Sequence, residues 1–315
     1  MTVQAVAAAY SRHQARIGSL ATTRTAAQWS AINPTDISGS WAASVGPAMT
    51  TTLTAAQRLA AAGAPTYVQA SLDAQGAAYD PQAVISPAAF SGLSADGRTL
   101  SGLLYLPVID TKQAIASGMS TADALARGGR LLEMLVATET ADAGRDALSA
   151  QMSATPAVHG YVRMVAGSAC GRCIVLAGKW YHANAGFQRH PRCQCTGIPA
   201  AENSPDLRTN PHAFFDHLSR EQQDARFGAA DAEAIRNGAD LFQVVNAHRG
   251  LSERELFGRT VQTTTEGITR RGLAGQVMRT NGVKGPRLSV RQIFADAGED
   301  RALALSLLRR YGYLY

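Results

Sequence analysis

The four cysteines of the chain lie together between residues 170 and 195, with a histidine among them. Cys170 and Cys173 form a Cys-x-x-Cys pair, and His190, Cys193 and Cys195 follow in a second segment. Two thiolates at this spacing can bind one side of a tetrahedral ion, and a Cys/His pair from a second segment can close the other side. The spacing therefore predicts a metal site, and zinc is the ion that such ligands favour.

Five candidate ligands compete for the four positions of a tetrahedral zinc site. Either the four cysteines bind with His190 beside them, or His190 replaces Cys193 or Cys195. A structural site has all four positions filled by protein, whereas a catalytic site keeps one position open for water. Because the cluster offers more ligands than the ion needs, we expect a structural zinc.

Two disulfide bonds are an alternative use of four cysteines. The residues after Met1 form a mixed Ala/Gln/Tyr stretch and lack the basic start and apolar core of a secretory signal. A reducing cytoplasm, in which disulfides are rare, suits the cluster better and favours metal binding.

Sequence patterns of known enzyme classes are missing. The His-x-Glu of zinc deaminases has only His182-Ala-Asn184 as a counterpart, and this tripeptide supplies no carboxylate. His-Glu-x-x-His, Gly-x-Ser-x-Gly and phosphate-binding glycine loops are absent from the sequence. We therefore expect no enzyme. The alternative is a zinc-stapled nucleic-acid-binding protein or nuclease, with His182, Asn184 or His190 facing a phosphate.

Composition predicts a mostly helical chain. Of its 315 residues, 46% are hydrophobic and only 6% aromatic, and the abundant alanine favours helices that pack closely. This length is sufficient for two domains with separate cores. No run of about 18 apolar residues occurs, so we expect no membrane span.

Charge is concentrated in the second half of the chain. Residues 1–159 hold nine Lys/Arg and ten Asp/Glu, whereas residues 160–315 hold twenty-one and fourteen. Eight basic residues lie in one C-terminal stretch: Arg254, Arg259, Arg270, Arg271, Arg279, Lys284, Arg287 and Arg291. Such a stretch can contact nucleic-acid phosphates or an acidic partner, or form a solvated face. Aromatic residues for base stacking are not interleaved with it.

Apolar residues at helical spacing predict a helix over residues 2–31. Thr35 or Asp36 can cap a second helix, which Pro47 interrupts, and further helices follow at 48–62 and 65–78. Within this helical bundle, Trp29 and Trp41 are expected to be core residues.

Prolines and glycines indicate a loop-rich connector over residues 80–118, in which 103–109 is a strand or a buried helix. Ser120 and Asp123 form a capping-box pattern for a helix that runs to about residue 152. Glu139 and Asp142 on this helix are expected to be solvated.

Alternating apolar residues predict strands at 161–165 and 173–177, with Cys170 and Cys173 on the turn between them, as in a zinc knuckle.

Helical signals return after residue 199. Asn210 or Thr209 caps one helix, and Ser219 with Gln222 caps the next. We expect a further helix at 229–237, a strand at 261–265, and two last helices that start near Ser289 and Glu299. The tyrosine-rich tail at 309–315 is either a docking segment or folded back on its own domain.

The segments around the cysteines resemble the Cys/His signature of Mu F-like head-morphogenesis proteins, the minor capsid proteins of tailed bacteriophages. They are GKWY at 178–181, NAGF at 184–187 and RHPRCQC at 189–195. The similarity is strongest to versions from phages of actinobacteria and continues at 219–223, 234–250, 264–272 and 307–313. The resemblance covers about the C-terminal half of the chain well, whereas the N-terminal half is similar only in the general character of its sequence.

This resemblance implies a minor capsid protein that is present in few copies, in the head interior or at the portal vertex of the virion. Such a protein is made in the host cytoplasm and acts in head assembly or in DNA packaging and ejection. The implied partners are the portal protein, the major capsid protein or both, and packaged DNA through the basic C-terminal region. No membrane partner and no established catalytic activity are implied.

We thus predict an α+β, mostly α fold. A helical N-terminal domain precedes a small zinc-stapled α+β module and a helical C-terminal region. The expected domains are a helical region with its connector at 1–118, a head-morphogenesis domain with the Cys/His cluster at 119–250, and a basic region at 251–315.

Overall fold

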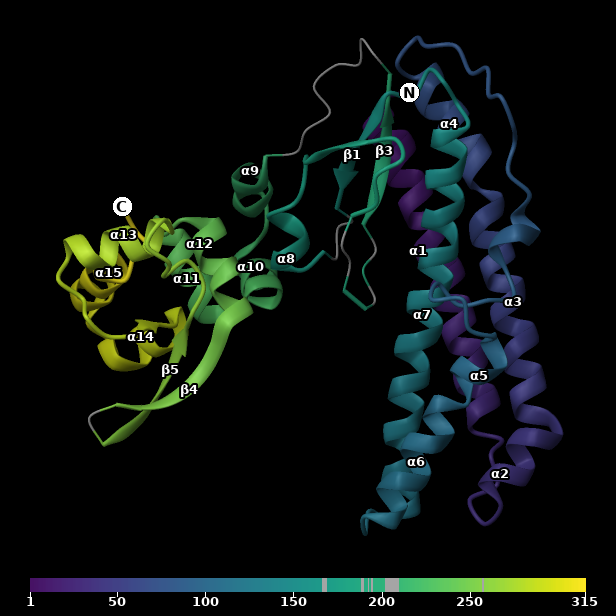
Figure 1. Cartoon of the computed structure of the whole chain (residues 1–315), viewed down its shortest axis with the longest axis horizontal. Helices are drawn as coiled ribbons and strands as arrows, with labels where there is room; N and C mark the ends of the chain where they lie inside the picture. The colour runs from purple at the N-terminus through teal and green to yellow at the C-terminus, as the bar shows by residue number, and fades with distance from the viewer. Residues whose placement is uncertain (166–168, 188–189, 192, 194, 202–209, 257) are drawn as a thin grey trace. The chain divides into compact units, whose positions relative to one another are not determined.

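A computed structural model of the chain describes residues 1–165, 169–187, 190–191, 193, 195–201, 210–256 and 258–315 (Figure 1). The described residues form many helices and two three-stranded antiparallel sheets. The predicted α+β, mostly α class is therefore confirmed.

The chain divides into two compact units. The N-terminal unit contains Met1–Ala166 and Gly178–Arg208, and the C-terminal unit contains Gly167–Ala177 and Thr209–Tyr315. The domain boundaries predicted after residues 118 and 250 stay predictions.

Helices make up most of the N-terminal unit. They are α1 (Val3–Trp29), α2 (Ile37–Ser40), the π-helix η1 (Trp41–Val45), α3 (Gly46–Ala62), α4 (Ala64–Asp73), the 3₁₀ helix η2 (Pro87–Phe90), α5 (Leu100–Leu104), α6 (Leu106–Ala116) and α7 (Thr121–Ser153). The long helices α1, α3 and α7 lie side by side (Figure 1).

The predicted first helix is confirmed as α1. It begins where the Thr2 hydroxyl accepts a hydrogen bond from the Ala5 amide (3.2 Å), which satisfies one of the unpaired amides of the first turn. Its buried face recurs at helical spacing through Val3 and Val6 to Tyr10. The Tyr10 ring stacks on Tyr67 of α4 at 4.0 Å between centroids, so the apolar stripe of α1 forms part of the core.

Both tryptophans are confirmed as core residues. Trp29 and Trp41 meet edge to face at 6.5 Å between ring centroids, and Trp29 Nε1 donates to the Leu125 carbonyl at 3.0 Å. A Cβ on Gly128 of α7 would lie 2.8 Å from the Trp29 ring. Glycine at that position therefore lets α7 approach the indole closely.

Asp36, rather than Thr35, caps α2 by accepting from the Gly39 amide at 2.9 Å. The predicted interruption at Pro47 is wrong, because the chain passes from α2 through η1 into α3 without leaving the helical conformation. The wider π-turn ends with Gly46 N–H bonded to the Trp41 carbonyl, which places Pro47 in the first turn of α3. A proline is tolerated there because amides of a first turn need no intrahelical partner.

The predicted loop-rich connector at 80–118 is wrong for most of its second half. Residues 100–116 form α5 and α6, so the buried-helix alternative for 103–109 is the correct one. Leu104 and Val108 are fully buried in the core cluster that also contains Trp29 and Trp41. Pro107 occupies the first turn of α6, where it starts a helix instead of breaking one.

Helix α7 is confirmed, with Ser120 as its N-cap: the hydroxyl accepts from the Asp123 amide at 3.2 Å. The prediction that Glu139 and Asp142 are solvated is wrong. Glu139 is only 8% exposed, and its carboxylate accepts from the Ala95 amide at 2.9 Å. Burial raises the pKa of Glu139 above its usual value. Asp142 is largely covered and pairs with Arg145 at 2.7 Å.

A small sheet completes the N-terminal unit. Its order is β2 (Trp180–His182), β1 (Gly160–Met164) and β3 (Thr196–Ala200), all antiparallel. The predicted strand at 161–165 is thereby confirmed. Tyr161 of β1 lies opposite Tyr181 of β2, and their rings stack at 5.3 Å between centroids.

The C-terminal unit consists of short helices and a second sheet of order β4-β5-β6. Its elements are α8 (Gly171–Ile174), α9 (Pro211–Asp216), α10 (Arg220–Phe227), α11 (Ala229–Arg236), α12 (Leu241–Asn246), the 3₁₀ helix η3 (Ala247–Gly250), β4 (Leu251–Leu256), β5 (Arg259–Thr264), α13 (Leu273–Thr280), β6 (Arg287–Leu288), α14 (Val290–Ala297) and α15 (Arg301–Arg310). The helices predicted near 210, 219, 229, 289 and 299 and the strand near 261 are confirmed.

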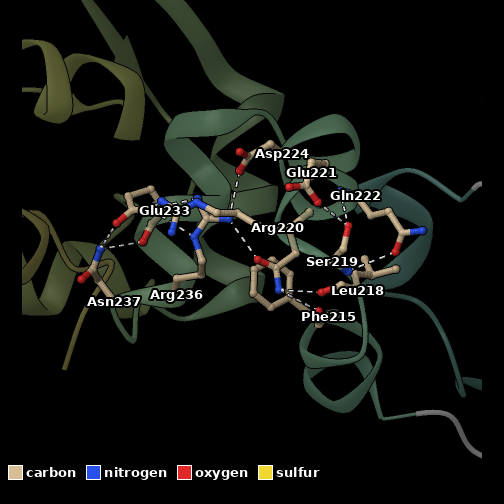
Figure 2. Close-up of polar contacts among 11 residues, drawn as sticks. Phe215, Leu218, Ser219, Arg220, Glu221, Gln222, Asp224, Glu233, Arg236 and Asn237 are labelled. Atoms are coloured by element: carbon tan, nitrogen blue, oxygen red, sulfur yellow. Dashed lines mark hydrogen bonds and ion pairs between the residues drawn. The ribbon is translucent and has the colours of Figure 1, made fainter.

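Local capping fixes the ends of these helices. Asn210 caps α9, whereas its predicted alternative Thr209 lies outside the described residues. Ser219 and Gln222 form the complete capping box of α10 (Figure 2). In the same view Arg236 of α11 reaches Asp224 of α10 at 2.9 Å, so an ion pair joins the two helices.

The C-terminal tail folds back on its own unit, as one of the two alternatives predicted. Tyr313 is fully buried, and its hydroxyl donates to the Leu288 carbonyl at 2.9 Å. The guanidinium of Arg287, also fully buried, lies 3.8 Å from the Tyr313 ring and donates to the carbonyls of Tyr311 and Gly312. These carbonyl oxygens thus provide the hydrogen-bond acceptors that the buried guanidinium needs, and the same bonds hold the tail in place.

Candidate metal centre

The first cysteine pair lies on a short helix. The strand predicted at 173–177 is wrong, and so is the zinc-knuckle hairpin built on it, because residues 171–174 form α8. The Cys170 carbonyl accepts hydrogen bonds from the amides of Cys173 (2.9 Å) and Ile174 (3.1 Å), which closes a helical turn. A Cβ on Gly171 would lie 2.9 Å from the Phe227 ring, so packing against α10 favours glycine between the two cysteines.

The second group of candidate ligands precedes β3. The Cys193 amide donates to the His190 carbonyl at 3.1 Å, and Cys195 comes directly before the strand. The Cys195 carbonyl accepts from Arg145 Nε of α7 at 2.8 Å. Residues 189, 192 and 194 of the signature lie outside the described residues.

The structure brings the ligand atoms of the five candidates into two overlapping groups. The ligand atoms of Cys170, Cys173 and His190 lie within 4.8 Å of one another, as do those of Cys173, Cys193 and Cys195. With Zn–S bonds of about 2.3 Å, sulfurs of a tetrahedral site are separated by about 3.8 Å. Small side-chain adjustments reach that spacing, so the cluster could hold a metal ion.

Cys173 belongs to both groups. A set of four ligands that omits Cys173 leaves both groups incomplete. A set of four that includes Cys173 always retains at least one of its neighbours from each group. Cys173 is therefore the candidate ligand that the two groups have in common.

The two groups differ in burial. Cys173, Cys193 and Cys195 are 2–3% exposed, whereas Cys170 and His190 are half-buried. Three shielded sulfurs are typical of a structural site, in which protein atoms exclude water from the ion. Cys170 and His190 form the more accessible side of the cluster.

A hydrogen bond to the backbone orients the His190 ring. Its Nδ1 lies 2.8 Å from the Pro191 carbonyl. In the tautomer that donates this bond, Nε2 carries the lone pair of the ring, and such contacts commonly fix the ring of a ligating histidine.

Of the three residues that the nuclease alternative places at a phosphate, His190 belongs to the cluster, whereas His182 and Asn184 lie on or beside β2. His182 lies on β2 with its ring against Trp180 (4.7 Å between centroids), and both His182 and Asn184 are exposed. Among the described residues, neither group that could hold an ion includes His182.

Arg145 is a supporting residue that the sequence did not indicate. It joins α7 to the cluster by donating to the Cys195 carbonyl, and Asp142 pairs with the other side of its guanidinium at 2.7 Å. The only signal was the Asp-x-x-Arg spacing, which is common on solvated helices.

None of the helices in the described part of the chain has the length and apolar character needed to span a bilayer.

Neither the curated proteins nor the solved structures include one that matches this sequence significantly. A sequence model of the VG15 protein family matches residues 1–219, a segment that contains the N-terminal helices and the whole Cys/His cluster. With most of its length matched, the chain belongs to the VG15 protein family, a family of viral gene products.

Proposed function

We propose that this protein is a minor capsid, or head-morphogenesis, protein of a tailed phage. The supporting observation is the Cys/His cluster: its signature resembles that of the Mu F-like proteins, and it lies inside the segment shared with a viral protein family. The protein resides in the head interior or at the portal vertex and acts by binding other proteins during head assembly or DNA packaging and ejection. It is not an enzyme.

The metal in this proposal is a structural zinc. Cys173, Cys193 and Cys195 supply buried sulfurs, and Cys170 or His190 completes the set. Bound zinc would stabilise a segment with little core of its own, since α8 is one turn long and β3 has five residues.

The proposed protein partners are the portal protein and the major capsid protein. Chemical crosslinking of assembled heads, followed by mass spectrometry, tests this assignment. We expect crosslinks from this chain to portal or capsid subunits. Heads that contain the protein without any such crosslink, or heads that lack it, would refute the proposal.

Packaged DNA is a further proposed partner through the basic C-terminal region. Three of the eight basic residues predicted there are already engaged: Arg287 is buried, Arg259 pairs with Asp296 at 2.8 Å, and Arg279 donates to the Arg270 carbonyl at 2.6 Å. Arg254, Arg270 and Arg271 are exposed, and no ion pair joins them to a carboxylate within the part of the chain that the structure describes. These exposed arginines also favour the second candidate function, a zinc-stapled nucleic-acid-binding protein or nuclease.

A cleavage assay separates the two candidates. Purified protein is incubated with single- and double-stranded DNA and RNA with and without zinc, and His182→Ala and His190→Ala serve as controls. A minor capsid protein should leave every substrate intact in all variants. Zinc-dependent cleavage that either substitution abolishes would establish the nuclease instead.

A further inference from the structure

A cavity in the C-terminal unit contains a charged pair that the metal centre does not use. The cavity has a volume of about 570 Å³, and its walls include residues of α11, η3, β5 and the start of α14. Figure 1 labels α11, β5 and α14 in the C-terminal unit. His248 of η3 and Asp231 of α11 lie on its wall and are joined by a hydrogen bond from His248 Nε2 to the Asp231 carboxylate. Seventeen residues separate them in sequence, so only the fold brings them together.

The pair is buried on one side and open on the other. The Asp231 side chain is 10% exposed and the His248 side chain 42%. The hydrogen bond to Asp231 raises the pKa of His248 above its usual value, against the opposing effects of burial and of Arg172. The protonated ring has a second donor at Nδ1, and its positive charge offsets the carboxylate behind it.

The rest of the cavity wall is largely apolar, with Phe227, Val244 and Leu251 among its residues, and a few hydrogen-bond donors lie within it. Arg291 lines it from the first turn of α14 and, among the described residues, has no carboxylate partner. Gln262 accepts from the Ser289 hydroxyl through Oε1 (2.8 Å), which leaves its amide nitrogen as a donor.

Helix α11 adds backbone donors. It begins at Ala229 after Gly228, which has a positive φ of 92° and provides no side-chain cap. The first amides of a helix have no intrahelical partner, and both Ala229 and Ala230 line the cavity. Arg291, the imidazole of His248, an amide and backbone N–H groups therefore line one space, and the carboxylate in its lining, that of Asp231, is already bonded to His248.

We infer that this cavity binds a phosphate group, held by His248 and Arg291 with amides of Gln262 and α11 completing the site. An arginine and the first amides of a helix suit the tetrahedral oxygens of phosphate, and a carboxylate behind the histidine orients the ring. The group can belong to a free phosphate compound or to a nucleic-acid strand. This inference does not depend on the proposed capsid role.

The test uses the full-length protein and NMR titration with sodium phosphate, and with sodium sulfate as a dianion whose charge does not change near neutral pH. We expect saturable shifts of the Ala229 and Ala230 amides and of the His248 ring. His248→Gln and Arg291→Gln should each weaken binding by about tenfold, the loss expected for one charge-assisted hydrogen bond. Arg24→Gln, at an exposed position of helix α1 in the N-terminal unit, is the control and should bind as the wild type does.

Acidity provides an independent readout. The charged groups around His248 are Asp231, Arg172 and Arg291, with Arg249 on its own element. Protonation of His248 adds the positive charge that the anion needs, so sulfate should bind more tightly at pH 6 than at pH 8, and His248→Gln should remove most of that difference. Circular dichroism of each variant verifies that the fold is retained, and the exposed Arg291 can be replaced without disturbing the core.

A short single-stranded DNA with a 5′-phosphate identifies the source of the group. Binding of the DNA that His248→Gln and Arg291→Gln both weaken indicates a nucleic-acid phosphate. Binding of phosphate and sulfate alone, with the same sensitivity, indicates a small phosphate compound. The inference is overturned if neither anion shifts the Ala229 and Ala230 amides, or if the two variants bind as Arg24→Gln does.

Discussion

Cys173 illustrates how much one residue can decide in a cluster with redundant ligands. Because it belongs to both groups of neighbouring ligand atoms, Cys173→Ser should abolish stoichiometric zinc binding. Cys170→Ser leaves four candidates, including three buried sulfurs, and should retain zinc with lower affinity. Elemental analysis of the purified variants measures this difference. Equal zinc content in wild type and Cys173→Ser would show that the ion is not bound here.

Glu139 is a second residue whose burial has a measurable consequence. Burial raises its folded pKa above the value of about 4.3 typical of an unfolded chain, so the folded state binds this proton more tightly. The associated stability is present below the unfolded pKa and is lost as pH rises through the folded pKa. Glu139→Gln keeps an acceptor for the Ala95 amide but does not titrate. Its free energy of unfolding, relative to that of the wild type, should therefore increase from pH 4 to pH 7.

Urea unfolding of the wild type and Glu139→Gln at pH 4 and pH 7 measures this change. Glu139→Leu is the contrasting variant: it leaves the Ala95 amide without its acceptor and should cost about 1–3 kcal/mol at either pH. A stability difference between Glu139→Gln and wild type that is the same at both pH values would contradict the expectation.

At the scale of elements, the α10–α11 pair is held by a network centred on Arg236 (Figure 2). This side chain is 19% exposed and bonds Asp224 and Gln223 of α10 at 2.9 Å and Glu233 of its own helix at 2.8 Å. Arg236→Gln should lower the free energy of unfolding by about 1–2 kcal/mol, because partly buried charged partners lose their hydrogen bonds.

Arg220 is the matched control for Arg236. It pairs with the same Glu233 at 2.8 Å, but its side chain is 67% exposed. An exposed ion pair contributes about 0–1 kcal/mol, so Arg220→Gln should have a small effect in chemical denaturation. Equal losses for the two variants would show that burial does not distinguish these pairs.

At the scale of the whole molecule, the proposed structural zinc predicts that metal removal weakens the fold. Structural zinc contributes on the order of 10 kcal/mol to the domains that it organises. Treatment with a chelator under reducing conditions should lower the midpoint of thermal unfolding, and zinc, but not magnesium, should restore it. Cys173→Ser should already unfold at the lower temperature and should not respond to chelator. An unchanged midpoint after demonstrated zinc loss would refute a structural role.

The sequence by itself determined features that depend on near neighbours. Helices α1 and α7 follow from apolar spacing and from caps at Thr2 and Ser120, and the Ser219 capping box fixes α10. These signals operate within a few residues, so they can be read without knowing which distant segments the fold brings together. The spacing of the four cysteines and His190 likewise identified the candidate metal ligands.

Only the tertiary structure decided where burial and distant contacts overrule local preference. The apolar run that begins at Cys173 has the pattern of a strand, yet residues 171–174 form a helical turn packed against Phe227, far along the chain. In the sequence Glu139 does not differ from an exposed helix glutamate, and only the fold buries it and places the Ala95 amide against its carboxylate. Arg145 at Cys195, Arg287 at the tail and His248 at Asp231 are also long-range pairs. Their partners are distant in sequence, and neither spacing nor propensity encodes which residues the fold brings into contact.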